Sequence, residues 1–343
     1  MNQDNNGSGA DNSNQANCLN FLIDTNIWRY IVDNKSQRKF ITLAKDPAIN
    51  IQVAPSCLYE VMRMQKGNLR SDQITLMTNP NLSRLMPEAY SECVELLMEI
   101  KRCRPHWLKK QPDLTKFNRL YKFWSRKSGG RWSKITKNLD LEAQNLQSLE
   151  GNSLNELRKN YKDLRKVARK KGPSHNIIPL DRYVSKVPKR IAKKSQYTHT
   201  GAWREESFKH FTTSLLLNQT TYSEWLEPLV DLNKVISQFD EWEEFWAIEV
   251  STENLPREWL RWAHLKAQSF RKPTGGSPGD NQLFSYILET DFVISSDKVF
   301  IDLIDEIKPH APFSYTFPQT WVLPAGDQGV EKLFQYLAEV GTQ

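Results

Sequence analysis

The sequence has few cysteines and no long apolar run. The thiols at positions 18, 57, 93 and 103 form no CxxC pair, which excludes a disulfide-rich scaffold and a zinc site built from paired cysteines. No apolar run approaches the roughly 18 residues that a membrane helix needs. Residues 1–17, rich in Asn, Gly and Ser, have neither the basic start nor the apolar stretch of a secretory signal. We therefore expect a flexible polar tail and a cytoplasmic protein with reduced thiols and no membrane contact.

The net charge of +7 hides a strong asymmetry along the chain. Residues 1–100 carry a net charge of −2, residues 101–200 carry +20, and residues 201–343 carry −11. A basic middle segment between two acidic segments indicates a module with a partner of its own. Polyanions, and nucleic acids above all, are the class of partner that such a charge attracts.

Short apolar runs alternate with amphipathic stretches at both ends of the chain. Strands are expected at 19–24, 51–54, 245–250, 291–295 and 320–324, and a helix begins at Pro55. This βαβα rhythm predicts an α/β fold with a parallel, roughly five-stranded sheet. The rhythm stops in the basic, mainly α-helical middle. We therefore divide the chain into a tail at 1–17, a first core part at 18–66, a basic helical insertion at 67–204, a helical extension at 205–241 and a second core part at 242–343.

Four acidic residues stand where strands end or helices begin. They are Asp24, Glu60, Asp280 and Asp297. In a parallel sheet, strand carboxyl ends and helix amino ends share one edge, so these side chains are expected to converge there. Carboxylates that lie close together repel each other, and hard divalent cations such as Mg²⁺ or Mn²⁺ relieve that repulsion. The pattern predicts a metal site able to activate water.

Each of these residues also has a purely local interpretation. Asp24 and Asp280 could only cap helices, Glu60 could be a solvated helix residue, and Asp297 could begin a turn. Asn26 and Ser295 would orient ligands or water at the proposed site, or serve as local caps. Their joint occurrence on corresponding elements favours the shared site.

The same motifs resemble those of the PIN domain nucleases. The similar segments are "FLIDTNIWRY", "VAPSCLYEVMR", "GDNQLFSYIL" and "FVISSDKVF", in the family's order. The resemblance covers roughly 18–66 and 242–325. It implies a compact α/β/α sandwich and a Mg²⁺- or Mn²⁺-dependent nuclease that usually acts on RNA, with catalytic and metal-binding roles for the four acids. The chain departs from the family in the 219 residues that separate Glu60 from Asp280.

Two other functions remain open on the sequence. A HAD-like phosphatase also has an acid after its first strand, although Asn26 stands where that chemistry needs a protonatable Asp. A non-catalytic binding protein on a PIN scaffold is the other alternative, but it has no need to keep four mutually repelling acids.

The basic insertion is expected to bind nucleic acid, RNA rather than DNA, mainly through charge. Aromatic residues alternate with its cations and could stack on bases. They are Trp107, Phe117, Tyr121, Phe123, Trp124 and Trp132. The alternative is a docking surface for a protein partner, such as an acidic inhibitor. The predicted phosphate contacts are Arg126, Lys127, Arg131, Arg165, Lys166, Arg169 and Lys170.

Overall fold

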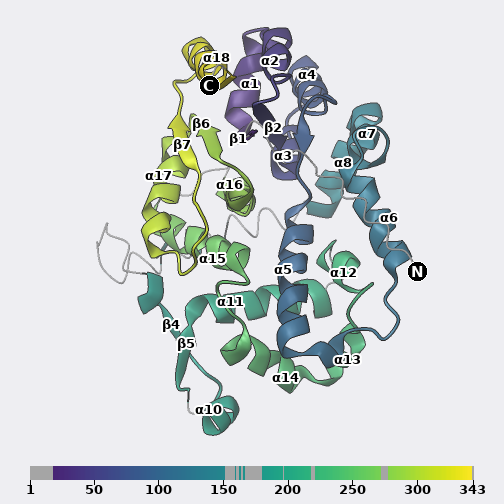
Figure 1. The fold of residues 1–343 in the computed structure, drawn as a ribbon, viewed down its shortest axis with the longest axis vertical. Helices are drawn as coiled ribbons and strands as arrows, with labels where there is room; N and C mark the ends of the chain where they lie inside the picture. Colours follow the sequence, from purple (N-terminus) through teal and green to yellow (C-terminus); the bar gives the residue numbers. More distant parts are fainter. Residues whose placement is uncertain are drawn as a thin grey trace, which may run out of the picture.

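A parallel five-stranded sheet forms the centre of the fold (Figure 1). The computed structural model describes residues 18–150, 159, 162–163, 165–166, 180–195, 197–217, 221–271 and 277–341. The expected tail at 1–17 therefore lies outside the described residues. The strands, in the spatial order β3-β2-β1-β6-β7, are β1 (Leu19–Ile23), β2 (Ile49–Val53), β3 (Ser83–Arg84), β6 (Phe292–Ser295) and β7 (Gln319–Val322).

The sheet has a switch point between β1 and β6. The chain first builds outward from β1 through β2 to β3, and it later returns to place β6 on the other side of β1. Phe21 pairs with Phe292 and Ile23 with Ile294 across this boundary, in parallel register. Because the following connections diverge here, the carboxyl ends of β1 and β6 leave a crevice, which is where open α/β sheets bind ligands.

Helices cover the sheet. All four residues of β6 and the last three of β1 are buried, and continuous burial means that both faces of a parallel strand are covered. The covering helices are α1 (Thr25–Asp33), α2 (Gln37–Leu43), α3 (Pro55–Met62), α4 (Asn68–Met77), α16 (Ser277–Phe284), α17 (Lys298–Ile307) and α18 (Asp327–Gly341). The predicted α/β class with a parallel five-stranded sheet is confirmed, and the layering is compatible with an α/β/α sandwich.

A helical body forms between β3 and β6, and Figure 1 draws part of it below the sheet and part of it beside the sheet. It also carries one antiparallel hairpin, β4 (Val184–Lys186) with β5 (His199–Gly201). Its helices are α5 (Glu88–Cys103), α6 (Leu114–Ser125), α7 (Gly130–Lys137), α8 (Leu139–Glu150), α10 (Lys189–Ser195), α11 (Ala202–Phe211), α12 (Thr221–Leu226), α13 (Leu232–Ser237), α14 (Phe239–Glu244) and α15 (Pro256–Gln268).

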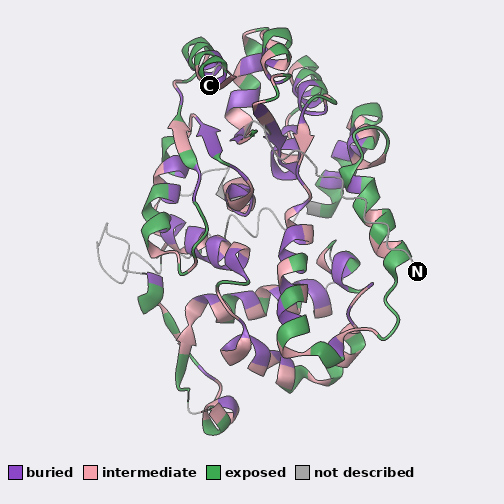
Figure 2. Cartoon of the chain, viewed as in Figure 1, coloured by how far each residue is buried: buried purple, intermediate pink, exposed green. Residues whose placement is uncertain are grey.

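One hydrophobic cluster joins the sheet to the helical body, as the buried inner faces in Figure 2 show. In the helical body this cluster is rich in aromatic rings. Trp107, Trp242 and Phe245 pack against each other, and Trp246 stacks on Phe211 with ring centroids 5.3 Å apart. Such rings bury large apolar areas, so they supply a core to helices that have no sheet to pack on. No helix in the described part of the chain combines the length and apolarity needed to cross a bilayer.

One predicted strand is wrong, and one strand of the sheet was not predicted. Residues 245–250 were expected to form a strand, but Phe245–Glu249 is a π-helical segment that continues α14. A short apolar run fits a buried strand and a buried helix equally well, and its position beside the aromatic core selected the helix. The fifth strand is β3 instead, which lies inside the segment assigned to the insertion, so the sheet extends to Arg84 rather than ending before residue 67.

Candidate metal site at the sheet edge

Asp24 lies at the carboxyl end of β1 and is 8% exposed. Its Oδ1 accepts a hydrogen bond of 2.6 Å from the Thr25 amide, so it caps α1 as the local interpretation predicted. Its Oδ2 accepts two further bonds, from Asn26 Nδ2 at 2.7 Å and from Ser295 Oγ at 2.6 Å. Capping therefore does not exclude a place in the site, because the second oxygen faces β6.

Asn26 and Ser295 join the ends of β1 and β6 across the switch point. Asn26 Nδ2 also donates to Ser295 Oγ at 3.3 Å, and Asn26 Oδ1 accepts from the Ser296 amide at 3.2 Å. Ser295 Oγ in turn accepts from the Asp297 amide at 2.9 Å. Asp297 caps α17 by accepting from the amides of the next turn. These bonds hold Asp24 and Asp297 at the adjacent carboxyl ends of the two strands.

Glu60 and the start of α16 come to the same edge from different parts of the chain. Glu60 Oε2 accepts a bond of 2.8 Å from Thr25 Oγ1, which links α3 to the first residue of α1. A Cβ atom placed on Gly279 would lie 3.6 Å from Glu60 Oε2, so α16 begins beside this carboxylate. Asp280 follows in the first turn of α16. It was expected to open that helix, but the helix begins three residues earlier, at Ser277.

The four carboxyl groups act on each other electrostatically. Burial raises the pKa of Asp24 to about 6, with hydrogen bonds from Ser295 and Thr25 opposing the rise and the charges of Glu60 and Asp297 adding to it. Burial likewise raises the pKa of Asp280 well above its usual range, and the charges of Asp24, Glu60 and Asp297 raise it further. Carboxylate oxygens are the donors that Mg²⁺ or Mn²⁺ prefers, so the chemistry of this donor set suits such an ion. Among the described residues, however, no three of the four acids bring ligand atoms within 4.8 Å of one another.

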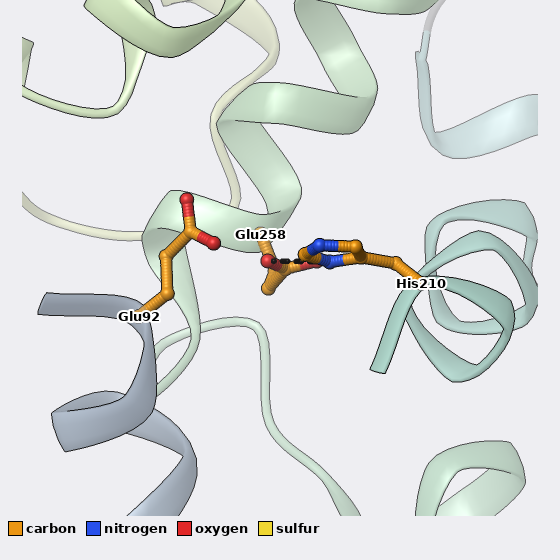
Figure 3. Close-up of side chains that lie close together, drawn as sticks. All are labelled: Glu92, His210 and Glu258. Carbon is orange, nitrogen blue, oxygen red and sulfur yellow. Dashed lines mark hydrogen bonds and ion pairs between the residues drawn. The ribbon is translucent and has the colours of Figure 1, made fainter. Parts of the chain in front are cut away.

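A second group of possible ligands was missed by the sequence analysis. Among the described residues, only Glu92, His210 and Glu258 bring three such ligand atoms within 4.8 Å of one another (Figure 3). They come from α5, α11 and α15 and lie in the helical body. His210 Nδ1 lies 3.3 Å from Glu258 Oε1. No local pattern could reveal this group, because its members are more than 40 residues apart in the sequence.

Arg261 identifies this second group as a structural ion network. Its Nη1 lies 2.7 Å from Glu92 Oε2, which also accepts a bond of 2.7 Å from Tyr222. Burial opposes ionisation of Glu258, but His210 and Arg261 lower the pKa of that carboxyl to about 2. A guanidinium and an imidazole therefore already contact the two carboxylates without a metal ion. The network instead ties α5 to α11 and α15.

The residues predicted to contact phosphate differ in their exposure and in whether another side chain already binds them. Arg126 and Lys127 are exposed beyond the end of α6. Arg131 is bound to the buried Glu142 and lies over the rings of Tyr59 and Trp124, so it has a structural role. Lys166 is exposed but lies 3.1 Å from Asp163, and Arg165 is half-buried. Arg169 and Lys170 lie outside the described residues.

Three of the six proposed stacking aromatics are buried in the core, and Phe117 is half-buried. Trp107 and Trp132 are fully buried and Trp124 nearly so, which makes them unavailable to bases. The Arg84 guanidinium lies over the Trp132 ring, 5.2 Å from its centroid, so another residue of the protein already covers a face of this indole. Tyr121 and Phe123 are exposed. Apolar rings in a basic segment can complete a core or bind a ligand, and their sequence spacing does not separate the two uses.

Comparison with protein-family models, with curated proteins and with solved structures finds no match for this chain.

Proposed function

We propose that the protein is a PIN-type nuclease that uses a divalent cation to hydrolyse phosphodiester bonds, with RNA as its substrate. The observation that carries this proposal is the mutual effect of four acids at one sheet edge. Asp24, Glu60 and Asp297 all raise the pKa of Asp280, although the four come from four different elements. Carboxylates that lie close together without a cation repel each other, so their retention at the ligand-binding edge of a sheet favours a function that needs them.

Mg²⁺ or Mn²⁺ would be held by Asp24, Glu60, Asp280 and Asp297. Such an ion activates water as a nucleophile and stabilises the leaving oxygen of a phosphodiester. The chain itself would supply the orientation. Asn26 and Ser295 donate to the same oxygen of Asp24, and Thr25 donates to Glu60, so two of the carboxylates are held in fixed positions before any ligand binds.

The phosphatase alternative is less well supported. It needs a general acid two residues after the nucleophile, and Asn26 has no proton to transfer at that position. Its amide donates to Asp24 instead. That chemistry would also leave Glu60 and Asp280 without a role.

The decisive experiment compares Asp24→Asn and Asp297→Asn with a matched control, Asp305→Asn. Asp305 is an exposed acid on the same helix, α17. Labelled single-stranded RNA, single-stranded DNA and duplex DNA are incubated with each protein in Mg²⁺, in Mn²⁺ or in EDTA. We expect metal-dependent cleavage of RNA, a loss on the order of 100-fold or more in the two site variants, and no loss in the control.

Two results would reject the proposal. Cleavage that persists in EDTA or in both site variants would show that these acids do not supply the chemistry. The absence of cleavage of any substrate by the parent protein would favour the non-catalytic scaffold instead.

A further inference from the structure

A pocket of about 540 Å³ lies along one face of α6. Its lining includes Asn118, Arg119, Lys122, Phe123, Arg126 and Gly130. Asn118, Lys122 and Arg126 recur at intervals of four residues, with Arg119 beside them, so their side chains follow a single stripe of the helix. This stripe rises by about 12 Å from end to end. We call this feature the α6 pocket.

The α6 pocket is cationic and its cations have no acidic partner. Arg119, Lys122 and Arg126 line it, and no acidic residue does. Within the described part of the chain, none of these three forms an ion pair, whereas the neighbouring cations do. Lys116 pairs with Glu227 at 2.7 Å, and Lys134 pairs with the buried Glu142 at 3.0 Å. The charge of the basic segment is thus neutralised around the pocket and left uncompensated inside it.

Phe123 adds an apolar surface between these cations. It is 36% exposed, and it lines both the α6 pocket and an adjoining pocket of about 650 Å³. The adjoining pocket also includes Tyr59 and Gln282, which flank Glu60 and Asp280 in the sequence. Phe123 therefore lies between the two pockets.

The turn after α6 fixes the shape of the α6 pocket. Gly129 and Gly130 have φ values of +75° and +72°, a region that favours glycine. A Cβ atom on Gly130 would collide with the Phe123 carbonyl oxygen. Arg84 Nη1 donates to the Arg126 carbonyl at 2.7 Å, which anchors the same turn to β3. Close backbone contact therefore holds the turn at this end of the pocket.

We propose that the α6 pocket binds single-stranded nucleic acid, with Arg119, Lys122 and Arg126 at successive phosphates and Phe123 stacked on a base. This inference rests on the proposed nuclease function and adds the strandedness of its substrate. An exposed ring between phosphate-binding cations suits an unpaired base, because base faces in a duplex are already stacked on their neighbours.

The test measures binding in EDTA, so that its outcome does not depend on cleavage. The probe is a fluorescent 20-nucleotide oligouridine, and its affinity is followed by anisotropy across a range of salt concentrations. We expect the Arg119→Gln, Lys122→Gln, Arg126→Gln triple variant to lose about tenfold or more in affinity and about 2 from the salt slope. Phe123→Ala should lose about 5- to 100-fold.

The chain offers a matched control for charge. Lys35, Arg38 and Lys45 line another pocket, beyond the opposite end of α1 from Asp24, together with Asp72 and without an aromatic ring. Changing these three cations to Gln removes the same charge, and this control variant should bind oligouridine like the parent. Circular dichroism of each variant verifies the fold, which surface substitutions should preserve.

Several outcomes would overturn the inference. They are unchanged binding in the α6 triple variant, an equal loss in the control triple variant, or tighter binding of a duplex of the same length than of the single strand. Failure of the nuclease proposal gives a different result, since RNA would then stay intact with Mg²⁺ and Mn²⁺ while the α6 variants still lose binding. If the parent cleaves RNA and the α6 variants bind and cleave equally well, the nuclease proposal stands and the α6 pocket is not its binding site.

Discussion

Replacing Asp24 by Asn should change the pH dependence of stability in metal-free protein. Burial and neighbouring charges raise the pKa of Asp24 to about 6 from its usual value of 3.8. Since the folded state then binds a proton more tightly than the unfolded state, ionisation of Asp24 destabilises the fold. This penalty is absent below pH 3.8, grows up to about pH 6, and is complete above it. A shift of about 2 pKa units corresponds to about 3 kcal/mol.

The measurement is urea unfolding of the parent and of Asp24→Asn in EDTA, followed by tryptophan fluorescence at pH 4 and at pH 7.5. The free energy of unfolding of the parent, relative to that of the variant, should fall by about 3 kcal/mol between these two pH values. The pH-independent effects of the substitution, such as altered bonds to Asn26 and Ser295, cancel in this double difference. Asp305→Asn, which removes an exposed acid, should show no such change.

Divalent cations should reverse the effect of the substitution. With the metal at 100 times its dissociation constant, the parent should gain about 2.7 kcal/mol, and the variant should gain less because it lacks one ligand. A parent-minus-variant difference that stays within about 1 kcal/mol across the pH range would refute the assigned burial and repulsion. Equal stabilisation of both proteins by Mg²⁺ or Mn²⁺ would show that Asp24 is not a ligand.

Three further substitutions test the structural assignments. Arg261→Met should lower the free energy of unfolding by about 3–5 kcal/mol, because Glu92 would stay buried without its cation. The counter-test is the melting temperature of the parent at pH 5, where the sheet-edge acids hold metal weakly. A melting temperature that falls on addition of EDTA would indicate a metal in that network. Trp132→Phe should leave oligouridine binding unchanged, since this ring is fully buried, and weaker binding by anisotropy would contradict its core assignment. Gly130→Ala should destabilise the protein by at least about 1–3 kcal/mol in urea unfolding. The loss should exceed that of Gly129→Ala, whose new methyl group would meet open space. Equal losses would show that only backbone strain matters at these two positions.

Local sequence patterns were sufficient for the elements around the candidate site. These patterns are buried strands that end on polar residues, helix caps and the Pro55 helix start. Each depends on neighbours within a few positions, so it can be predicted without knowledge of the fold. For the same reason, four of the five strands and the helix start at Pro55 lie close to their expected positions. The two-residue strand β3 was missed because so short an element carries no period.

The use of each charged or aromatic side chain depended on partners far away in the sequence. Arg131 was expected to contact phosphate. It instead pairs with Glu142 and lies over the rings of Tyr59 and Trp124. Nothing in the basic segment distinguishes Arg131 from Arg119 or Lys122, which remain unpaired among the described residues. Charge was therefore predictable for the segment as a whole and not for any one residue.

The sequence by itself determined which chemical groups stand at the ends of strands, and the parallel sheet that follows from its βαβ rhythm brings those ends to one edge. Only the tertiary structure decided how the groups meet there. Hydrogen bonds from Asn26 and Ser295 converge on one oxygen of Asp24, although Ser295 is 271 residues away. The burial that raises the pKa of Asp24 and Asp280 likewise comes from helices folded over the sheet edge. Desolvation and long-range contact are properties of packed elements, and no stretch of the sequence contains them alone.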